Sequence, residues 1–235
     1  MCALEVKALV FDVFGTVVDW RTSIIRQGKE FGKANGVEAD WDAFADAWRG
    51  KYGPSMNRVR TGELPWTNLD ALHRMALEEV LTEFNITGIS EEVKAEFNLA
   101  WHKLDPWPDS VPGLWRLKAK HIIAPMSNGN IALMTNMAKN AGLPWDCVLS
   151  AELSGHYKPD AEVYEKAADL LSLPPHRIMM VAAHKGDLRA AQRVGFKAAW
   201  VPRPLEYGPS RTIDTTPDPE FDYSATDFID LAAQL

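Results

Sequence analysis

The apolar run Ala8 to Phe11, followed directly by Asp12, constrains the fold more than any other part of the sequence. Its residues are apolar on both faces, which predicts a central parallel strand covered by helices on either side. Gly15 follows and predicts a sharp turn just past the strand's carboxyl end. Ligands bind at that end in open α/β sheets. Asp12 is therefore either a functional carboxylate or a turn-forming aspartate.

The composition is that of an ordinary soluble protein. A chain of 235 residues, 46% hydrophobic and 24% charged, suits one large domain or a core with a smaller insertion. Its net charge of −7 argues against nucleic acid and against an anionic membrane as partners. Cys2 and Cys147 form no disulfide framework, and Glu5 and Lys7 precede the first strand without room for a signal peptide. We therefore expect a cytoplasmic protein.

The pattern turns helical after Thr16 and stays so for about eighty residues. Gly53 and Pro54 predict the end of the second helix and an irregular segment up to residue 66. Pro106 and Pro108 then predict a linker. Four helices without a strand signal predict an inserted subdomain at residues 17–105, with residues 1–16 and 106–235 forming the core. The four helices are expected at about 22–33, 39–52, 68–84 and 90–104.

From Ser110 onward helical and strand-like segments alternate. This alternation predicts an α/β fold with a doubly wound parallel sheet and right-handed crossovers. The expected strands are 120–126, 146–150, 177–183 and 197–201. The expected helices are 110–119, one capped by Asn130 that ends near 141, 161–171, 187–194, and a short one from about 226.

Polar residues follow the ends of several of these strands. Thr16 follows the first strand, Ser127 and Asn128 follow the second, and Lys158, His184 and Asp187 come later in the chain. Because parallel strands end at one edge of the sheet, these side chains are expected to meet near Asp12. A lysine beside a buried aspartate favours the charged carboxylate, which is then a nucleophile.

Four segments, FDVFGT, MSNG, KPD and VAAHKGDL, stand in this order with a helical insertion after the first. They resemble the four motifs of the haloacid dehalogenase superfamily over essentially the whole chain. The resemblance implies a Rossmann-like core, an α-helical cap inserted after the first motif, and a covalent intermediate on Asp12.

Most members of that superfamily are Mg²⁺-dependent phosphatases, and this chain departs from their pattern. Phe14 stands where the phosphatases carry a second, proton-donating aspartate, and Ala183 stands where they carry a metal-binding one. Lys185 adds a positive charge nearby. Mg²⁺ prefers carboxylate oxygens, and phosphoryl transfer depends on it. A Mg²⁺-dependent phosphatase or phosphonatase is therefore the weaker alternative. A non-catalytic binding protein is a third possibility, and the retention of Asp12, Lys158 and Asp187 speaks against it.

In these same positions the chain resembles the (S)-2-haloacid dehalogenases. Those enzymes use no metal or other cofactor and carry an aromatic residue at the position of Phe14. The resemblance implies that Asp12 attacks the carbon bearing the halogen of a short-chain 2-haloacid, inverts it and expels halide. Water then hydrolyses the aspartyl ester to a 2-hydroxyacid. Relatives are commonly homodimers. The sequence leaves the preferred halogen and the chain length open.

The resemblance also assigns roles to single residues. Thr16, Ser127 and Asn128 match residues that hold the nucleophile and the substrate carboxylate. Lys158 would keep Asp12 ionised, with Tyr164 supporting the network. Asp187 matches the carboxylate that positions or activates water.

Arg49, which follows Trp48, stands where the family places its halide-binding arginine. A guanidinium suits a half-desolvated halide, whereas the alternative is an arginine on a solvated helix face. Phe14 and Trp48 are expected to contact substrate, and Arg58 and Arg60 are the reserve candidates for the halide. His184 replaces an asparagine of the better-known relatives, and it either activates water or fills the hydrogen-bonding place of that asparagine.

Overall fold

The computed structural model describes residues 6–235, and a six-stranded sheet with the order β5-β4-β1-β6-β7-β8 forms its centre. Every neighbouring pair in this sheet is parallel. The strand predicted around residues 8–11 is confirmed as β1, and it lies between β4 and β6 as a central strand. The strands are β1 (Ala8–Phe11), β4 (Ile122–Ser127), β5 (Leu149–Ser150), β6 (Ile178–Ala182), β7 (Lys197–Trp200) and β8 (Tyr223–Ser224).

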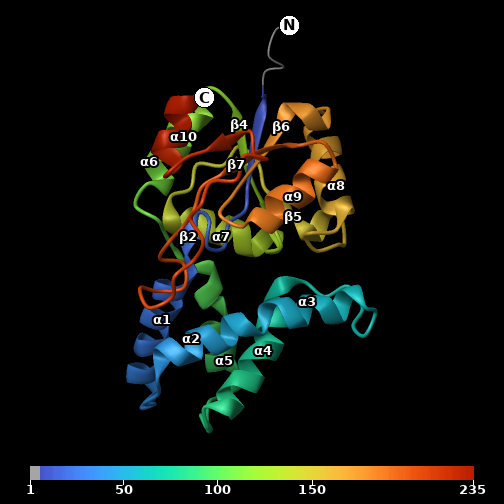
Figure 1. Ribbon diagram of the computed structural model, residues 1–235. Helices are drawn as coiled ribbons and strands as arrows, with labels where there is room; N and C mark the ends of the chain where they lie inside the picture. The colour runs from blue at the N-terminus through green and yellow to red at the C-terminus, as the bar shows by residue number, and fades with distance from the viewer. Residues whose placement is uncertain (1–5) are drawn as a thin grey trace, which may run out of the picture.

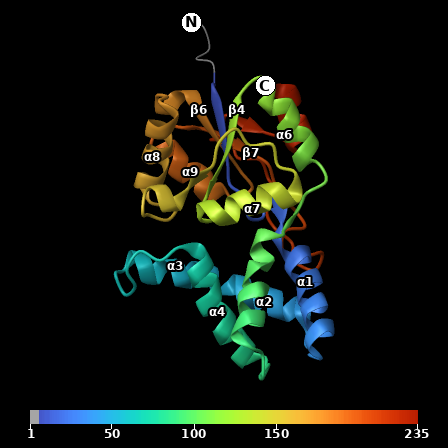
Figure 2. The same ribbon diagram turned by 180° about the vertical axis from the view of Figure 1, so that it is seen from behind.

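Helices cover both faces of the sheet (Figures 1 and 2). Alternate β1 residues point to opposite faces: Leu9 and Phe11 join the hydrophobic cluster of α6, α7 and α10, while Ala8 and Val10 join that of α8 and α9. The predicted doubly wound architecture is therefore confirmed. These helices are α6 (Ser110–Lys118), α7 (Ile131–Ala141), α8 (Ala161–Leu171), α9 (Lys185–Arg193) and α10 (Phe228–Gln234), with short 3₁₀ turns η2 (Ala151–Leu153) and η3 (Pro175–Arg177).

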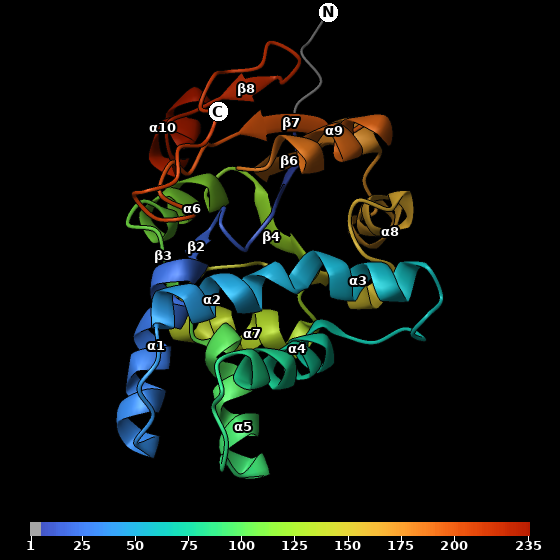
Figure 3. The same cartoon turned by 60° about the horizontal axis from the view of Figure 1, so that its bottom comes forward.

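The segment between β1 and α6 forms a separate group of helices at the carboxyl edge of the sheet, which we call the cap (Figures 1 and 3). It contains five α-helices, so the expected count of four is wrong. Pro54 does not end a helix, because it lies in the first turn of α3, where its missing N–H needs no partner. The elements are α1 (Trp20–Asn35), α2 (Trp41–Gly50), α3 (Tyr52–Arg60), α4 (Leu69–Glu83), α5 (Glu91–Asn98) and the 3₁₀ helix η1 (Leu99–His102).

At the N-termini of two helices, the residue expected to cap the helix with its side chain does not do so. The α1 helix begins two residues early because the Asp19 carboxylate, rather than Thr22 or Ser23, caps it and accepts from the Thr22 amide at 3.0 Å. Asn130 stands at the start of α7, but its side chain turns to Asp70 of the cap.

The two segments that connect the core to the cap lie side by side. β2 (Val18–Asp19) pairs antiparallel with β3 (Asp105–Pro106). The Trp107 indole donates to the Gly15 carbonyl at 3.0 Å, beside this pair. We propose that the domain boundaries lie here, with residues 17–105 as the cap domain and residues 1–16 and 106–235 as the core.

Within the described residues 6–235, no helix combines the length and apolarity that spanning a membrane requires. Cys147 is an exposed free thiol, while Cys2 and Glu5 lie outside the described part of the chain.

Candidate active site

A cavity of about 400 Å³ lies between the carboxyl ends of the strands and the cap, and we call it the reaction cavity. Its position agrees with the edge at which α/β sheets bind ligands. The core contributes Asp12, Phe14, Asn128, Lys158, His184 and Asp187 to its lining, and the cap contributes Arg49, Tyr52 and Met56.

Asp12, just past β1, is the centre of the polar network in this cavity, because three side chains bond to its carboxylate, and only 8% of it is exposed. Its Oδ2 accepts from Thr16 Oγ1 at 2.7 Å and contacts His184 Nδ1 at 2.9 Å, while its Oδ1 accepts from Lys158 Nζ at 3.0 Å. Burial alone would raise the pKa of Asp12. The charge of Lys158 and the bonds from His184 and Thr16 outweigh burial and lower that pKa far below its usual range. Asp12 is therefore ionised at neutral pH.

Lys158 bridges two carboxylates, because its Nζ also donates to Asp187 Oδ2 at 2.5 Å. Burial opposes its charge, but Asp12 and Asp187 outweigh burial and raise the pKa of Lys158. Asn128 Oδ1 accepts from the Lys158 amide at 2.7 Å and holds this loop against the end of β4.

Asp187 lies in the first turn of α9, and its Oδ1 accepts from the Tyr164 hydroxyl at 2.5 Å. Burial raises the pKa of Asp187 and the nearby charge of Asp12 adds to the rise, although Lys158 opposes it. Asp12 and Asp187 thus share one cation while their pKa values move in opposite directions. Such a pair suits a nucleophile beside a proton acceptor.

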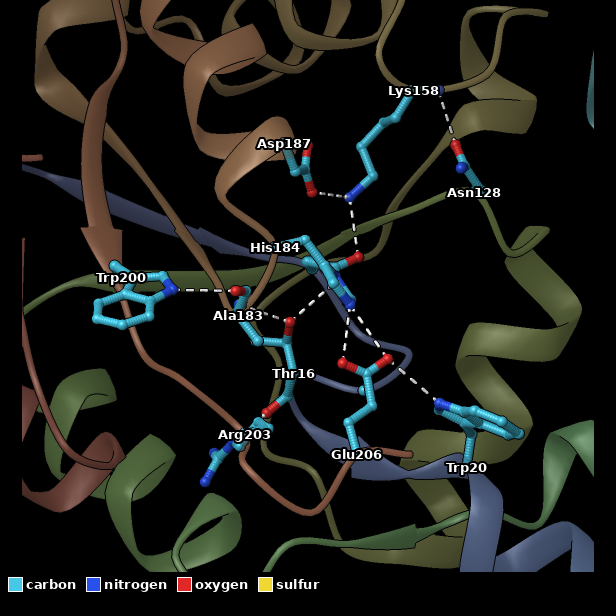
Figure 4. A network of polar contacts seen from close by, with 12 residues as sticks. Thr16, Trp20, Asn128, Lys158, Ala183, His184, Asp187, Trp200, Arg203 and Glu206 are labelled. Atoms are coloured by element: carbon cyan, nitrogen blue, oxygen red, sulfur yellow. Dashed lines mark hydrogen bonds and ion pairs between the residues drawn. The ribbon is translucent and has the colours of Figure 1, made fainter. Parts of the chain in front are cut away.

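His184 joins Asp12 to a residue that the sequence did not reveal. Its Nε2 contacts the Glu206 carboxylate at 3.0 and 3.1 Å, and Glu206 is only 1% exposed (Figure 4). Burial disfavours a charged imidazole, but the bonds to Asp12 and Glu206 raise the pKa of His184 to about 10. With a carboxylate at each ring nitrogen, His184 is an imidazolium that donates two hydrogen bonds.

Gly15 is the one sequence signal that points to Glu206. Its φ is +84°, and a Cβ there would lie 2.2 Å from Glu206 Oε1. The turn after Asp12 therefore needs glycine both for its backbone conformation and for the space that Glu206 fills. The sequence shows the glycine but not its distant partner.

Arg49 carries a positive charge that no carboxylate of the described residues neutralises. Its Cζ lies 4.0 Å from the Tyr52 ring centroid, 5.5 Å from that of Trp20 and 5.9 Å from that of Phe14. Its Nη1 is buried without a hydrogen-bond partner in the described part of the chain. A guanidinium surrounded by aromatic rings and facing a cavity is suited to an anion.

The reserve arginines lie elsewhere. Arg58 pairs with Glu63 on the surface, and Arg60 pairs with Asp160 and donates to the Lys158 carbonyl. Neither lines the reaction cavity.

Two expected contact residues do not reach the cavity. Trp48 is fully buried inside the cap, where its Nε1 donates to the His73 carbonyl at 3.0 Å. It belongs to the buried face of α2 together with Trp41 and Phe44, and Arg49 lies one position further round the helix. Ser127 is also buried, and its Oγ accepts from the Gly129 amide at 3.1 Å. By contrast, Phe14 lines the cavity as expected.

The residues do not fit the Mg²⁺ of the related phosphatases. Lys158 holds Asp12 Oδ1 and Asp187 Oδ2, while Thr16 and His184 occupy Asp12 Oδ2. Ala183 offers no side-chain oxygen. A hard cation would meet two fixed cations and too few free carboxylate oxygens.

Comparisons with known proteins agree with this geometry. The model of the haloacid dehalogenase-like hydrolases matches residues 6–195. (S)-2-haloacid dehalogenase 4A of Burkholderia cepacia is 30% identical over 217 residues, 86% of this chain and 87% of its own. A solved defluorinating L-2-haloacid dehalogenase is 47% identical with a TM-score of 0.95, covering 98% of this chain and 95% of its own. A second L-2-haloacid dehalogenase is 46% identical with a TM-score of 0.92, covering 98% and 99%. The chain therefore belongs to the haloacid dehalogenase-like hydrolases.

Proposed function

We propose that this protein hydrolyses short-chain (S)-2-haloacids to 2-hydroxyacids, with an aspartyl ester on Asp12 as intermediate. The observation that carries the proposal is the pairing, in one cavity, of an ionised carboxylate with an uncompensated guanidinium: Asp12 and Arg49. The first is a nucleophile for carbon and the second is a site for the departing halide. The names of the three relatives reported above, each a haloacid dehalogenase, support this substrate class.

The first step is displacement at carbon 2 of the haloacid. Asp12 Oδ1 is the attacking oxygen, because Oδ2 already accepts from both Thr16 and His184. The new carbon–oxygen bond forms as the carbon–halogen bond breaks on the opposite side, so carbon 2 is inverted. The halide takes the bonding electron pair and is stabilised by Arg49. The rings of Tyr52 and Phe14, which line the reaction cavity beside Arg49, leave the anion little competing water.

The second step is hydrolysis of the ester at the Asp12 carboxyl carbon. Asp187 accepts a proton from the attacking water, which its raised pKa favours. Thr16 and His184 already donate toward Oδ2, the oxygen that becomes negative in the tetrahedral intermediate. The bond between the carboxyl carbon and Oδ1 then breaks, and the alkoxide takes the remaining proton of the attacking water from the new carboxylic acid. The Asp12 carboxylate thereby re-forms, and Asp187 releases its proton to solvent. His184 thus serves as a donor, because a ring with a proton on each nitrogen has no lone pair with which to act as the base in the resting enzyme.

Halide release from 2-chloropropionate and the haloacetates tests the function. We expect turnover of (S)-2-chloropropionate with inversion, loss of at least about a thousandfold in kcat for Asp12→Asn, and no effect of EDTA. Mass spectrometry of enzyme quenched during turnover should find the ester on Asp12. Full activity of Asp12→Asn would exclude the covalent route. Loss of activity in EDTA, with turnover of p-nitrophenyl phosphate on added Mg²⁺, would favour the phosphatase alternative.

We also propose that the enzyme works as a cytoplasmic homodimer. The exposed free thiol of Cys147 supports a reducing compartment. Sedimentation velocity measures the association state, and a monomer at micromolar concentration would contradict the dimer.

A further inference from the structure

A second cavity, of about 460 Å³, lies on the other side of Arg49, and we call it the rear cavity. Arg49 and Tyr207 line both cavities, so these two side chains form the wall between them. The Arg49 guanidinium has Tyr52 of the reaction cavity and Trp20 of the rear cavity as ring neighbours. An anion held by Arg49 in the reaction cavity is therefore one side chain away from the rear cavity.

The rear cavity is rich in positive charge. Arg21, Arg49 and Arg211 line it, against the single carboxylate of Asp46. Arg21 is largely neutralised, because it bonds to both oxygens of Asp46 at 2.8 and 2.9 Å and reaches Asp42 at 3.5 Å. Arg211 stacks over the Tyr207 ring at 4.4 Å and makes no ion pair within the described residues. Two guanidiniums without a counter-ion thus face one hollow.

The reaction cavity offers a halide a less favourable way out. It contains the Asp187 carboxylate, and during the ester stage it also holds the organic half of the substrate with its own carboxylate. A halide leaving that way passes these two negative charges and also Lys158, His184 and Arg193, whose positive charges line the same cavity and would retain an anion. The rear cavity presents Arg211 and the Ser210 hydroxyl instead, and anions move toward such a potential.

We propose that the rear cavity is a halide-binding site that receives the halide from Arg49 and releases it to solvent while the ester still occupies the reaction cavity. The ligand class is a monovalent halide anion. This inference rests on the proposed function for its role in turnover, but the binding of halide at this site can be tested without turnover.

Bromide is the probe for binding. Crystals of the wild-type enzyme in sodium bromide should show two anomalous peaks, one on each side of Arg49. Arg211→Gln should remove the rear peak, keep the front peak, and raise the bromide inhibition constant roughly threefold to fivefold. Arg58→Gln is the matched control, because Arg58 is an α3 arginine that lines neither cavity. It should change neither the bromide peaks nor the inhibition constant. A peak on the reaction-cavity side alone would overturn the rear site. A rear peak that Arg211→Gln leaves in place would show an adventitious ion only, and it would overturn the site as well.

Filling the rear cavity tests its role as an exit. Ser210→Trp places a large side chain there, on the side of Arg49 that faces away from the reaction cavity. We expect single-turnover ester formation to keep its rate while steady-state kcat falls severalfold. An unchanged kcat would overturn the exit role. If no haloacid is turned over at all, the proposed function fails, and the bromide peaks still decide whether the rear site exists.

Discussion

His184 contacts a carboxylate through each ring nitrogen, and the two contacts come from different parts of the chain. Asp12 follows β1, whereas Glu206 lies in the loop after β7. Each anion favours the protonated ring, which is why the pKa of His184 rises to about 10 despite burial. This shift increases the free energy of unfolding. The full increase is present below pH 6.5, the pKa of the ring in the unfolded chain, and it is lost as the pH rises through about 10.

Glu206→Gln tests this arrangement through a pH profile. Removing an anion beside a cation lowers the pKa of His184, so the ring loses its proton at lower pH. We expect the alkaline fall of kcat, measured on a haloacetate between pH 6 and 11, to move down by roughly one pH unit or more. Glu162→Gln, on the exposed face of α8, is the control. An alkaline limb that stays in place would show that His184 is not the titrating group.

At the scale of elements, α3 of the cap holds the loop that carries Lys158. Arg60, at the end of α3, pairs with Asp160 at 3.1 Å and donates to the carbonyls of Tyr157 and Lys158. The Tyr157 hydroxyl donates in turn to the Thr67 carbonyl of the cap at 2.6 Å. Cap and core are thereby joined beside the reaction cavity. Arg60 is a positioning residue, since it acts on the reaction through Lys158.

Arg60→Ala should lower kcat/KM roughly threefold to tenfold, because the loop that places Lys158 beside Asp12 loses a charged hydrogen-bond donor. Arg58→Ala removes an arginine from the same helix whose partner, Glu63, is exposed, and it should leave kcat/KM unchanged. Steady-state kinetics on one haloacetate compares the two. Arg60→Lys should recover part of the loss, since it restores charge without the planar fork. Equal effects of the two alanine variants would contradict a specific role of Arg60.

At the scale of the whole molecule, Arg203 joins three distant segments. Its Nε donates to the Thr16 carbonyl at 2.8 Å, and its two terminal nitrogens bond to Asp109 at 2.6 and 2.9 Å. Asp109 also accepts from the Phe228 amide at the start of α10. Arg203 is 6% exposed. The first motif, the linker after the cap and the C-terminal helix therefore meet at one buried ion pair.

Arg203→Met should lower the free energy of unfolding by about 3 kcal/mol, because Asp109, whose side chain is only 13% exposed, is left without its cation. Burial raises the pKa of Asp109, but Arg203 outweighs burial and lowers that pKa. The ion pair therefore stabilises the folded protein at neutral pH, and this stabilisation is lost on acidification. Urea unfolding at pH 7 measures the change. Arg26→Met, at an ion pair that is about half exposed, should cost less than about 1 kcal/mol. Similar losses for both variants would argue against a special role of the buried pair.

Five strands of the central sheet, the order of the motifs and the position of Asp12 were predictable, because they depend on local signals. The two-residue strands β2, β3 and β8 were not predicted, since so short a segment shows no alternation of its own. Apolar runs of strand length, glycine at a turn and polar residues at strand ends can all be read within a few residues. Lys158, Asn128, Thr16 and Asp187 were placed at one edge by topology alone, since parallel strands end together. The cap was harder to predict, and Pro54 was misread because a proline that ends one helix and a proline in the first turn of the next look alike in sequence.

The sequence by itself therefore determined a doubly wound α/β core with Asp12 at its functional edge, and it determined that Phe14 stands beside the nucleophile. Only the tertiary structure decided that Arg49 rather than Trp48 faces the cavity, since adjacent residues on a helix point in directions about 100° apart. Only the tertiary structure brought Glu206 under Gly15 and against His184. The physical reason is that such contacts join loops far apart along the chain. The periodicity of a sequence encodes which residues are buried, but not which distant side chains they meet.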